Sequence, residues 1–232
     1  MNSIRLICLC VFLGGMSGAL HAAEASGQLS FRTLGVDDVA DDIYYTSGGK
    51  DTLVTVNPQC RSPYYPYTGT LTKLVFFRWI AGPDGEKIKQ PVATANVSAL
   101  GKRPILIFIA DPQNPDAYRV LGFADSVKDI PPGGYRFLNL TKQQVGVVLE
   151  KEKLLIPPAG EGILVSKPSA GETSCQVVVY GIIDQVPRAV YSSIWTWNEK
   201  RRSMVIVVPA PSRSSGVAVR CLPENVSNIP AQ

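Results

Sequence analysis

Histidine is almost missing from this chain. The single histidine, His21, lies in an N-terminal segment that we expect to be removed. A mature protein without histidine lacks the imidazole base of the usual Ser-His-Asp and Cys-His nucleophile systems. It also lacks histidine ligands for a metal ion. The hydrolytic and metal chemistries that depend on histidine are therefore excluded.

Strong charge and long apolar runs are lacking as well. The formal net charge is +4, and it becomes +3 once Arg5, the only charged residue of the leader, is removed. So small a charge, without a basic cluster interleaved with aromatic residues, excludes a dedicated nucleic-acid-binding role. No apolar stretch after the leader is long enough for a membrane span. Helical periodicity is also scarce, and the best helical candidate, Val36 to Ile43, is short and acidic.

Residues 1–22 are typical of a secretory signal peptide. Arg5 supplies the positive start, an apolar segment runs from Leu6 to Ala19, and Leu20-His21-Ala22 is an acceptable cleavage site. Cys8 and Cys10 lie inside the apolar segment and not at its end, which excludes a lipoprotein signal. We therefore expect an exported protein, periplasmic or secreted to the cell surface.

Strand and turn signals dominate the rest of the chain. Hydrophobic residues make up 45% of the sequence, and the 20 glycines and 18 prolines supply many turns. Short β-branched and aromatic runs follow one another without helices between them, which predicts antiparallel sheets. The run from Pro104 to Ala110 is continuously apolar, which predicts a strand buried on both faces. We predict an all-β fold: an antiparallel β-sandwich, built as one extended unit or as two small Ig-like units.

The composition suggests where this fold divides. We expect residues 23–166 to form a β-sandwich domain, followed at 167–173 by a linker or long loop rich in proline, serine and glycine. Residues 174–222 carry further strands, which form a second subdomain or complete the sandwich. Residues 223–232 are polar, and we expect a flexible tail there.

A sharp turn near the middle of the chain precedes one of the clearest strands. Pro131 and Pro132 fix φ and withhold two backbone donors, so neither a helix nor a central strand continues through them. Gly133 and Gly134 then permit positive φ, which allows the chain to reverse. The sequence therefore predicts a turn leading into a strand at 135–140.

Three runs of the sequence carry a resemblance to a known group of proteins. The runs are Leu74 to Arg78, Pro104 to Phe108 and Gly134 to Leu140. They resemble uncharacterised exported β-sandwich proteins of Gram-negative bacteria, over about half of the chain. The resemblance implies a β-sandwich fold and no particular activity.

Two aromatic groups are candidate ligand-binding residues. Tyr64, Tyr65 and Tyr67 lie around a rigid proline, and three phenols can stack on a sugar ring or on a partner surface. Trp195 and Trp197 are two residues apart in a predicted strand, so they share one face. Exposed, the pair would form a platform for polysaccharide. In the alternative interpretation, which we prefer for both groups, these rings are packing residues.

The only acidic cluster is the weak candidate for a cation site. Asp37, Asp38, Asp41 and Asp42 place four carboxylates in six residues, which could bind calcium. Their spacing does not match an EF-hand loop, so we interpret the cluster as a solvated loop and predict no metal site and no cofactor. Other aspartates lie in loops, as in glycoside hydrolases, but nothing nearby distinguishes them from turn residues, so we assign no catalytic residue.

The mature chain keeps three cysteines: Cys60, Cys175 and Cys221. An oxidising compartment favours one disulfide and one free thiol. Side-chain alternation places Cys175 and Cys221 on the apolar faces of their strands, so we predict that these two are bonded and that Cys60 is free. In the alternative, Cys60 is bonded to one of the other two.

These observations favour a binding protein over an enzyme. We expect a non-enzymatic interaction module in the cell envelope, with an envelope protein or a glycan as its partner. The alternatives are a carbohydrate-binding module that uses surface aromatics and a carboxylate-dependent glycoside hydrolase.

Overall fold

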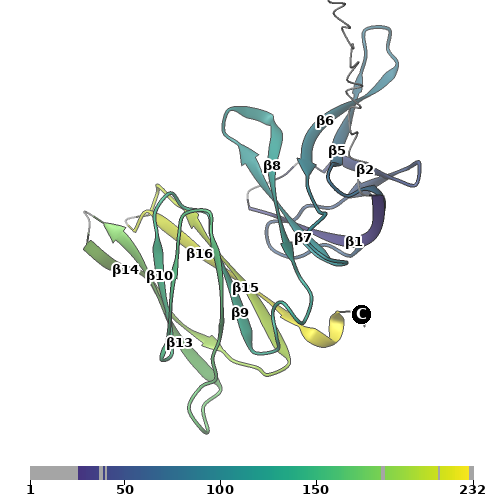
Figure 1. The fold of residues 1–232 in the computed structure, drawn as a ribbon. Coiled ribbons are helices and arrows are strands. Elements are labelled where there is room, and N and C mark those ends of the chain that lie inside the picture. Colours follow the sequence, from purple (N-terminus) through teal and green to yellow (C-terminus); the bar gives the residue numbers. More distant parts are fainter. Residues whose placement is uncertain (1–25, 37–38, 40, 184–185, 214, 230–232) are drawn as a thin grey trace, which may run out of the picture.

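The computed structural model describes residues 26–36, 39, 41–183, 186–213 and 215–229. The expected signal peptide at 1–22 lies outside these residues. The described part of the chain forms strands β1 to β16 and one short 3-10 helix, η1 (Val226–Asn228), and contains no α-helix (Figure 1). The all-β prediction is therefore confirmed. The helical candidate is not a helix where it is described, because β1 ends at Gly35, turn residues occupy 41–42 and β2 begins at Ile43.

Strands β1 to β8 form a first sandwich within residues 26–124. Their bounds are β1 (Ser26–Gly35), β2 (Ile43–Ser47), β3 (Lys50–Val54), β4 (Tyr65–Thr70), β5 (Leu74–Ala81), β6 (Lys87–Ala95), β7 (Pro104–Asp111) and β8 (Asn114–Ala124). Strands β9 to β16 form a second sandwich within residues 134–225. Their bounds are β9 (Gly134–Asn139), β10 (Val145–Leu149), β11 (Glu152–Ile156), β12 (Glu161–Val165), β13 (Ser174–Ile183), β14 (Val186–Thr196), β15 (Arg201–Pro209) and β16 (Val217–Asn225).

The two sandwiches have the same strand order. The first consists of the sheets β4-β1-β7-β8 and β3-β2-β5-β6, and the second of β12-β9-β15-β16 and β11-β10-β13-β14. Most strand pairs are antiparallel, but the parallel pair β1–β7 recurs as β9–β15. An irregularity in the β5–β6 register also recurs in β13–β14. The chain is thus an internal structural repeat of one eight-stranded unit.

This arrangement corrects the expected domain division. Strands β9 to β12, at 134–165, pair only with one another and with later strands, so residues 23–166 do not form one domain. The stretch at 167–173 is the loop between β12 and β13, inside the second sandwich. Composition points to a flexible stretch but does not show which strands pair across it. The division between the sandwiches falls at 125–133, around the turn that precedes β9.

Three apolar clusters hold the four sheets together. One fills each sandwich, and the third lies between the sandwiches, where the sheets β4-β1-β7-β8 and β12-β9-β15-β16 face each other. The middle strands of these inner sheets are therefore buried on both faces, as predicted for the run at 104–110, where residues 105–108 are fully buried. The cluster between the sandwiches contains Leu34, Val36, Ile105, Ile107, Leu138, Met204 and Ile206.

A buried charge network also joins the two sandwiches. Arg202 of β15 has no exposed side-chain surface, and its Nη2 lies 3.1 Å from Asp125 Oδ2 and 2.8 Å from Glu224 Oε2. Its Nη1 donates to the backbone oxygens of Asp125 and Ser126, both at 3.0 Å. Arg32 of β1 donates to the other oxygen of Glu224. Because Arg32 belongs to the first sandwich and Asp125 directly follows its last strand, these bonds fix one sandwich against the other.

The C-terminal end departs from the flexible tail expected at 223–232. Pro223 to Asn225 are part of β16, and the Glu224 side chain is only 8% exposed. Ile229 is buried after the short helix η1, while residues 230–232 lie outside the described residues. The polar composition is typical of a tail, but here Glu224 is a partner for buried arginines.

The turn at Pro131–Gly134 adopts the conformation that its glycines permit. Gly133 has a φ of +76°, and its N–H donates to the backbone oxygen of Arg201 at 2.6 Å. A Cβ added to Gly134 would lie 2.7 Å from the backbone oxygen of Pro131. Both glycines are therefore required by the backbone, which confirms the predicted turn into β9.

Replacing Gly134 by valine is expected to lower the free energy of unfolding by about 1 kcal/mol or more, because the side chain collides with a fixed carbonyl. Gly133→Val is expected to cost a similar amount through its positive φ. Urea denaturation measures both effects. Gly146→Ala is the control, because an added Cβ there makes only ordinary contacts, at 3.5 and 3.6 Å. Wild-type stability of both valine variants would contradict this account.

Removing the carboxylate of Glu224, which Arg32 and Arg202 share, is expected to lower the free energy of unfolding more than the glycine substitutions do. Glu224→Gln removes the carboxylate that pairs with Arg32 and leaves Arg202 with Asp125 alone, and breaking a buried ion pair costs about 3–5 kcal/mol. Denaturation at pH 7 measures this loss. Glu199→Gln, at an exposed turn, is the matched control and is expected to change stability by less than about 0.5 kcal/mol.

The stability difference between the wild type and Glu224→Gln is expected to depend on pH. Burial alone would raise the pKa of Glu224, but Arg61, Arg32 and Arg202 outweigh it, and the pKa is lowered below its usual 4.5. The stability from this group is therefore present above the unfolded-state pKa and is lost as pH falls through the folded-state pKa. Asp125, whose pKa is raised by burial, is present in both proteins. The stability difference between wild type and Glu224→Gln should shrink between pH 7 and pH 3, and a difference that grows would contradict the assignment.

Candidate functional site

The three tyrosines proposed as a stacking platform lie in different surroundings. The Tyr67 ring is buried in the core of the first sandwich, and its hydroxyl donates to the backbone oxygen of Thr70 at 2.8 Å. The Tyr65 ring packs against Phe31, with centroids 5.6 Å apart. Arg32 lies 4.9 Å from the centroid of the Tyr64 ring. These contacts match the packing interpretation, since the three rings do not share one exposed face.

The tryptophan pair also packs inward. Trp195 stacks on Tyr135 at 5.5 Å and on Phe137 at 6.2 Å, and its Nε1 donates to the hydroxyl of Tyr191 at 3.1 Å. Trp197 packs against the same core, that of the second sandwich, near Gly133. The two rings do share a face, as alternation predicted, and this face is the inner one.

The acidic cluster is only partly described, since Asp37 and Asp38 lie outside the described residues. Asp41 is exposed, and Asp42 Oδ1 lies 2.8 Å from Arg78 Nε. Within the described residues, no group of three or more potential ligands could hold a metal ion. Asp42 is thus the partner of an arginine at the end of the first sandwich.

The predicted disulfide between Cys175 and Cys221 is not formed, and Cys60 is a free thiol as well. Both predicted partners contact the second core, as expected, but Cys175 lies on β13 and Cys221 on β16, in opposite sheets. Side-chain alternation determines which face a cysteine occupies. It does not determine the register between two sheets, on which bonding distance depends.

The internal repeat reveals a site that the sequence candidates miss. Tyr44 of β2 pairs with Phe77 of β5, and in the second sandwich Gly146 of β10 pairs with Tyr180 of β13. Gly146 therefore occupies the position of Tyr44. In the first sandwich the rings of Tyr44 and Phe77 stack on the outer face, 6.0 Å apart. The second sandwich has only one of these two rings.

The outer face of the first sandwich is closed by its own side chains. Lys89 Nζ lies 4.4 Å from the centroid of the Phe77 ring and 5.3 Å from that of Trp79. The same ammonium group lies 2.6 Å from Asp51 Oδ1 and donates to Thr46 Oγ1 at 3.1 Å. A lysine thus lies across the aromatic rings and is held there by an acid and a hydroxyl.

The matching face of the second sandwich carries an apolar groove of about 720 Å³. Gly146 lies at the bottom of this groove, and the equivalent residue of the first sandwich is Tyr44, whose side chain occupies the space. Leu155, at one side of the groove, is 69% exposed. We call this feature the Gly146 groove, and it is lined by Gln144, Gly146, Val147, Val148, Lys153, Leu154, Leu155, Tyr180, Ile182 and Pro187.

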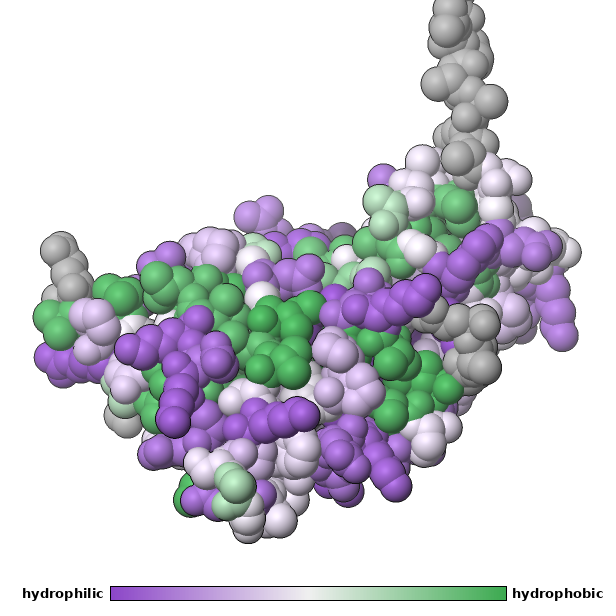
Figure 2. Space-filling view, turned by 60° about the horizontal axis from the view of Figure 1, so that its bottom comes forward, coloured by the Kyte–Doolittle hydropathy of each residue, from purple (hydrophilic) through white to green (hydrophobic). Residues whose placement is uncertain are grey.

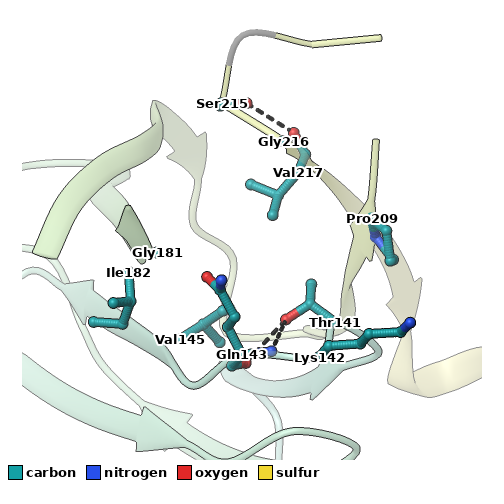
Figure 3. Close-up of a pocket in the computed structure, with 10 residues that line it drawn as sticks. All are labelled: Thr141, Lys142, Gln143, Val145, Gly181, Ile182, Pro209, Ser215, Gly216 and Val217. Carbon is teal, nitrogen blue, oxygen red and sulfur yellow. Dashed lines mark hydrogen bonds between the residues drawn. The ribbon is translucent and has the colours of Figure 1, made fainter. Parts of the chain in front are cut away.

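A second opening, of about 490 Å³, lies at one end of the second sandwich (Figure 3). In Figure 3, Thr141 and Gln143 are hydrogen-bonded to each other on one side, and Ile182 and Val217 line the space beside them. It is lined by Thr141, Lys142, Gln143, Val145, Gly181, Ile182, Pro209, Ser215, Gly216 and Val217.

The first sandwich fills this end with an arginine. Arg78 pairs with Asp42 at 2.8 Å and Asp116 at 3.8 Å, and its Nη2 donates to the Tyr118 hydroxyl at 3.4 Å. The registers place Gly181 at the position of Arg78, and Val217 at that of Tyr118. Small residues in the second sandwich therefore leave open both places that large residues fill in the first. No carboxylate lines either opening, so neither offers the acid pair of a glycoside hydrolase.

Comparison with known proteins adds no assignment: no protein-family model matches the chain, and no curated protein gives a significant match. Among the described residues, no helix has both the length and the apolar character needed to cross a membrane.

The thiols offer a direct test of the second core. Burial and the nearby Glu150 and Glu172 raise the pKa of the Cys175 thiol to about 11, and burial raises that of Cys221. Because only the thiolate is nucleophilic, we expect iodoacetamide at pH 8 to alkylate Cys60 alone in the folded protein. All three thiols should react after unfolding without a reductant. A Cys175–Cys221 crosslinked peptide, or a single reactive thiol after unfolding, would contradict the free-thiol arrangement.

Proposed function

We propose that this protein is a non-enzymatic binding module, exported to the cell envelope, that binds an envelope protein through the outer sheet β11-β10-β13-β14. The observation that carries the proposal is the Gly146 groove, an open apolar site at the position that the first sandwich fills with its own tyrosine. A solvent-facing side of an antiparallel sheet is normally polar. Here that side presents Val148, Leu155, Tyr180 and Ile182.

Exposed apolar side chains are concentrated in the same half. Five of the seven large hydrophobic residues exposed at the described surface belong to the second sandwich: Leu155, Ile163, Val165, Val186 and Ile194. Figure 2 shows apolar patches between polar side chains on one face of the molecule. Exposed apolar surface with a polar surround is typical of protein interaction sites.

A free sheet edge adjoins the groove. Strand β14 is the last strand of the outer sheet, and most of its residues are exposed, Ile194 at 72%. An extended segment of a partner can add to such an edge by backbone hydrogen bonds while its side chains enter a neighbouring groove. The aromatic residues that were candidates for a glycan platform pack inward, and this favours a protein partner over a polysaccharide.

Site-specific photocrosslinking in living cells tests this function. A photoreactive phenylalanine analogue replaces Leu155 on the proposed face or, as the matched control, Leu53. The repeat places these two residues at equivalent positions, and both are exposed, at 69% and 48%. With the native leader present, we expect a discrete crosslinked envelope protein from position 155 and none from position 53.

Absence of any crosslink from position 155 in a folded, exported protein would overturn the proposal. Equal crosslinking from both positions would show that the second face has no special role. Retention of the protein in the cytoplasm would contradict the expected export.

A further inference from the structure

We propose that the Gly146 groove binds an aromatic side chain of the protein partner, stacked against Tyr180, together with a carboxylate of the same partner at Lys153. This inference rests on the proposed function and specifies what its surface recognises. The partner segment would thus present an aromatic residue with an acidic group close by.

The aromatic preference follows from the repeat. In the first sandwich, the equivalent place is occupied by the Tyr44 ring, which stacks on Phe77 with an angle of 24° between the ring planes. The second sandwich keeps the receiving ring, Tyr180, and replaces Tyr44 by Gly146. A strand glycine leaves backbone and the adjacent ring uncovered, and an aromatic ring laid over it covers both. Offset stacking on Tyr180 is the arrangement that aromatic pairs prefer.

The space at Gly146 is open in the required direction. A Cβ added to this glycine would lie 3.5 Å from Tyr180 Cβ and 3.6 Å from Leu155 Cδ2, which are ordinary contact distances. Both flanking side chains therefore stand beside the glycine and do not cover it. A ring entering from outside would contact Tyr180 on one side and Leu155 on the other.

The carboxylate preference follows from charge complementarity. The registers place Lys153 where the first sandwich has Asp51, and Pro187 where it has Lys89. The second sandwich thus has a cation where the first has an anion, and the uncharged Pro187 opposite it cannot serve as the ion-pair partner. Lys153 is the one charged residue that lines the Gly146 groove, and it forms no ion pair within the described residues. An acidic group beside the bound ring would supply the missing partner.

Three small probes test the inference on the full mature chain by NMR titration. N-acetyl-L-tyrosine carries a ring and a carboxylate, N-acetyl-L-tyrosinamide only the ring, and N-acetyl-L-leucine only the carboxylate. We expect the first probe to shift the amide signals of Gly146, Leu155 and Tyr180. It should bind about 2–5-fold more tightly than the amide, the range of an exposed ion pair. The leucine probe should bind more weakly than either.

Two variants separate the two parts of the site. Gly146→Tyr restores the residue of the first sandwich, so it should abolish probe binding without lowering the melting temperature. Lys153→Met should make the acid and the amide bind equally. Lys151→Met is the matched control, because Lys151 is exposed at the β10–β11 turn and does not line the groove. It should keep the 2–5-fold preference.

Equal binding of the leucine and tyrosine probes, or probe shifts that persist in Gly146→Tyr, would overturn the inference. So would shifts that depend on protein concentration alone and vanish in Gly146→Tyr, because the occupant would then be a second copy of this chain. If position 155 crosslinks to a partner but the probes do not bind, the binding function stands and the aromatic specificity fails. If the probes bind but position 155 gives no crosslink, the groove has the proposed chemistry and the envelope partner is wrong.

Discussion

The position of Arg202 is the constraint on which the arrangement of the two sandwiches depends. A fully buried guanidinium is tolerated only where acceptors surround it. Here the acceptors come from two distant parts of the chain: Glu224 from the strand beside it, and Asp125 and Ser126 from the segment that directly follows the first sandwich. The apolar contact between the inner sheets buries surface without fixing one orientation, whereas the ion pairs and hydrogen bonds of Arg202 require a particular orientation. One relative placement satisfies all of them, so the two inner sheets are held face to face.

The repeat explains why similar positions serve both halves in this interface. Arg32 in β1 and Arg136 in β9 are equivalent, and each reaches the last strand of the other sandwich. Arg32 contacts Glu224 of β16, and Arg136 Nη1 lies at 2.5 Å from the backbone oxygen of Ala124 in β8. The two halves therefore pack with an approximate twofold relation, as the subunits of a symmetric dimer do. The exchange of arginines stabilises the interface from both sides.

Sequence reasoning reached the fold class because strand signals are local, but it missed features that depend on strand pairing. The continuously apolar run from Pro104 to Ala110 predicts a strand buried on both faces, and the structure confirms this prediction. The division of the chain was missed because pairing between β9 and β15 is not encoded in either strand by itself. Trp195 was a candidate ligand-binding residue because it is large and aromatic, whereas the groove lies at Gly146, where the side chain is missing. Gly146 gives no signal alone, and becomes informative only beside Tyr44, its counterpart in a pairing that sequence does not reveal.

The same scaffold has therefore been completed in two ways, and this limits where a partner can bind. The middle strands of the two inner sheets are buried against each other, so the broad sheet faces that remain accessible are those of the outer sheets. The first outer sheet is closed by Tyr44, which stacks on Phe77, and by Lys89, which pairs with Asp51. The second lacks the equivalent ring and carries Lys153 without an ion-pair partner in the described structure. A surface that is self-satisfied gains little from a partner, because its own contacts must first be broken. By this reasoning, the second outer sheet is the face that we propose for binding.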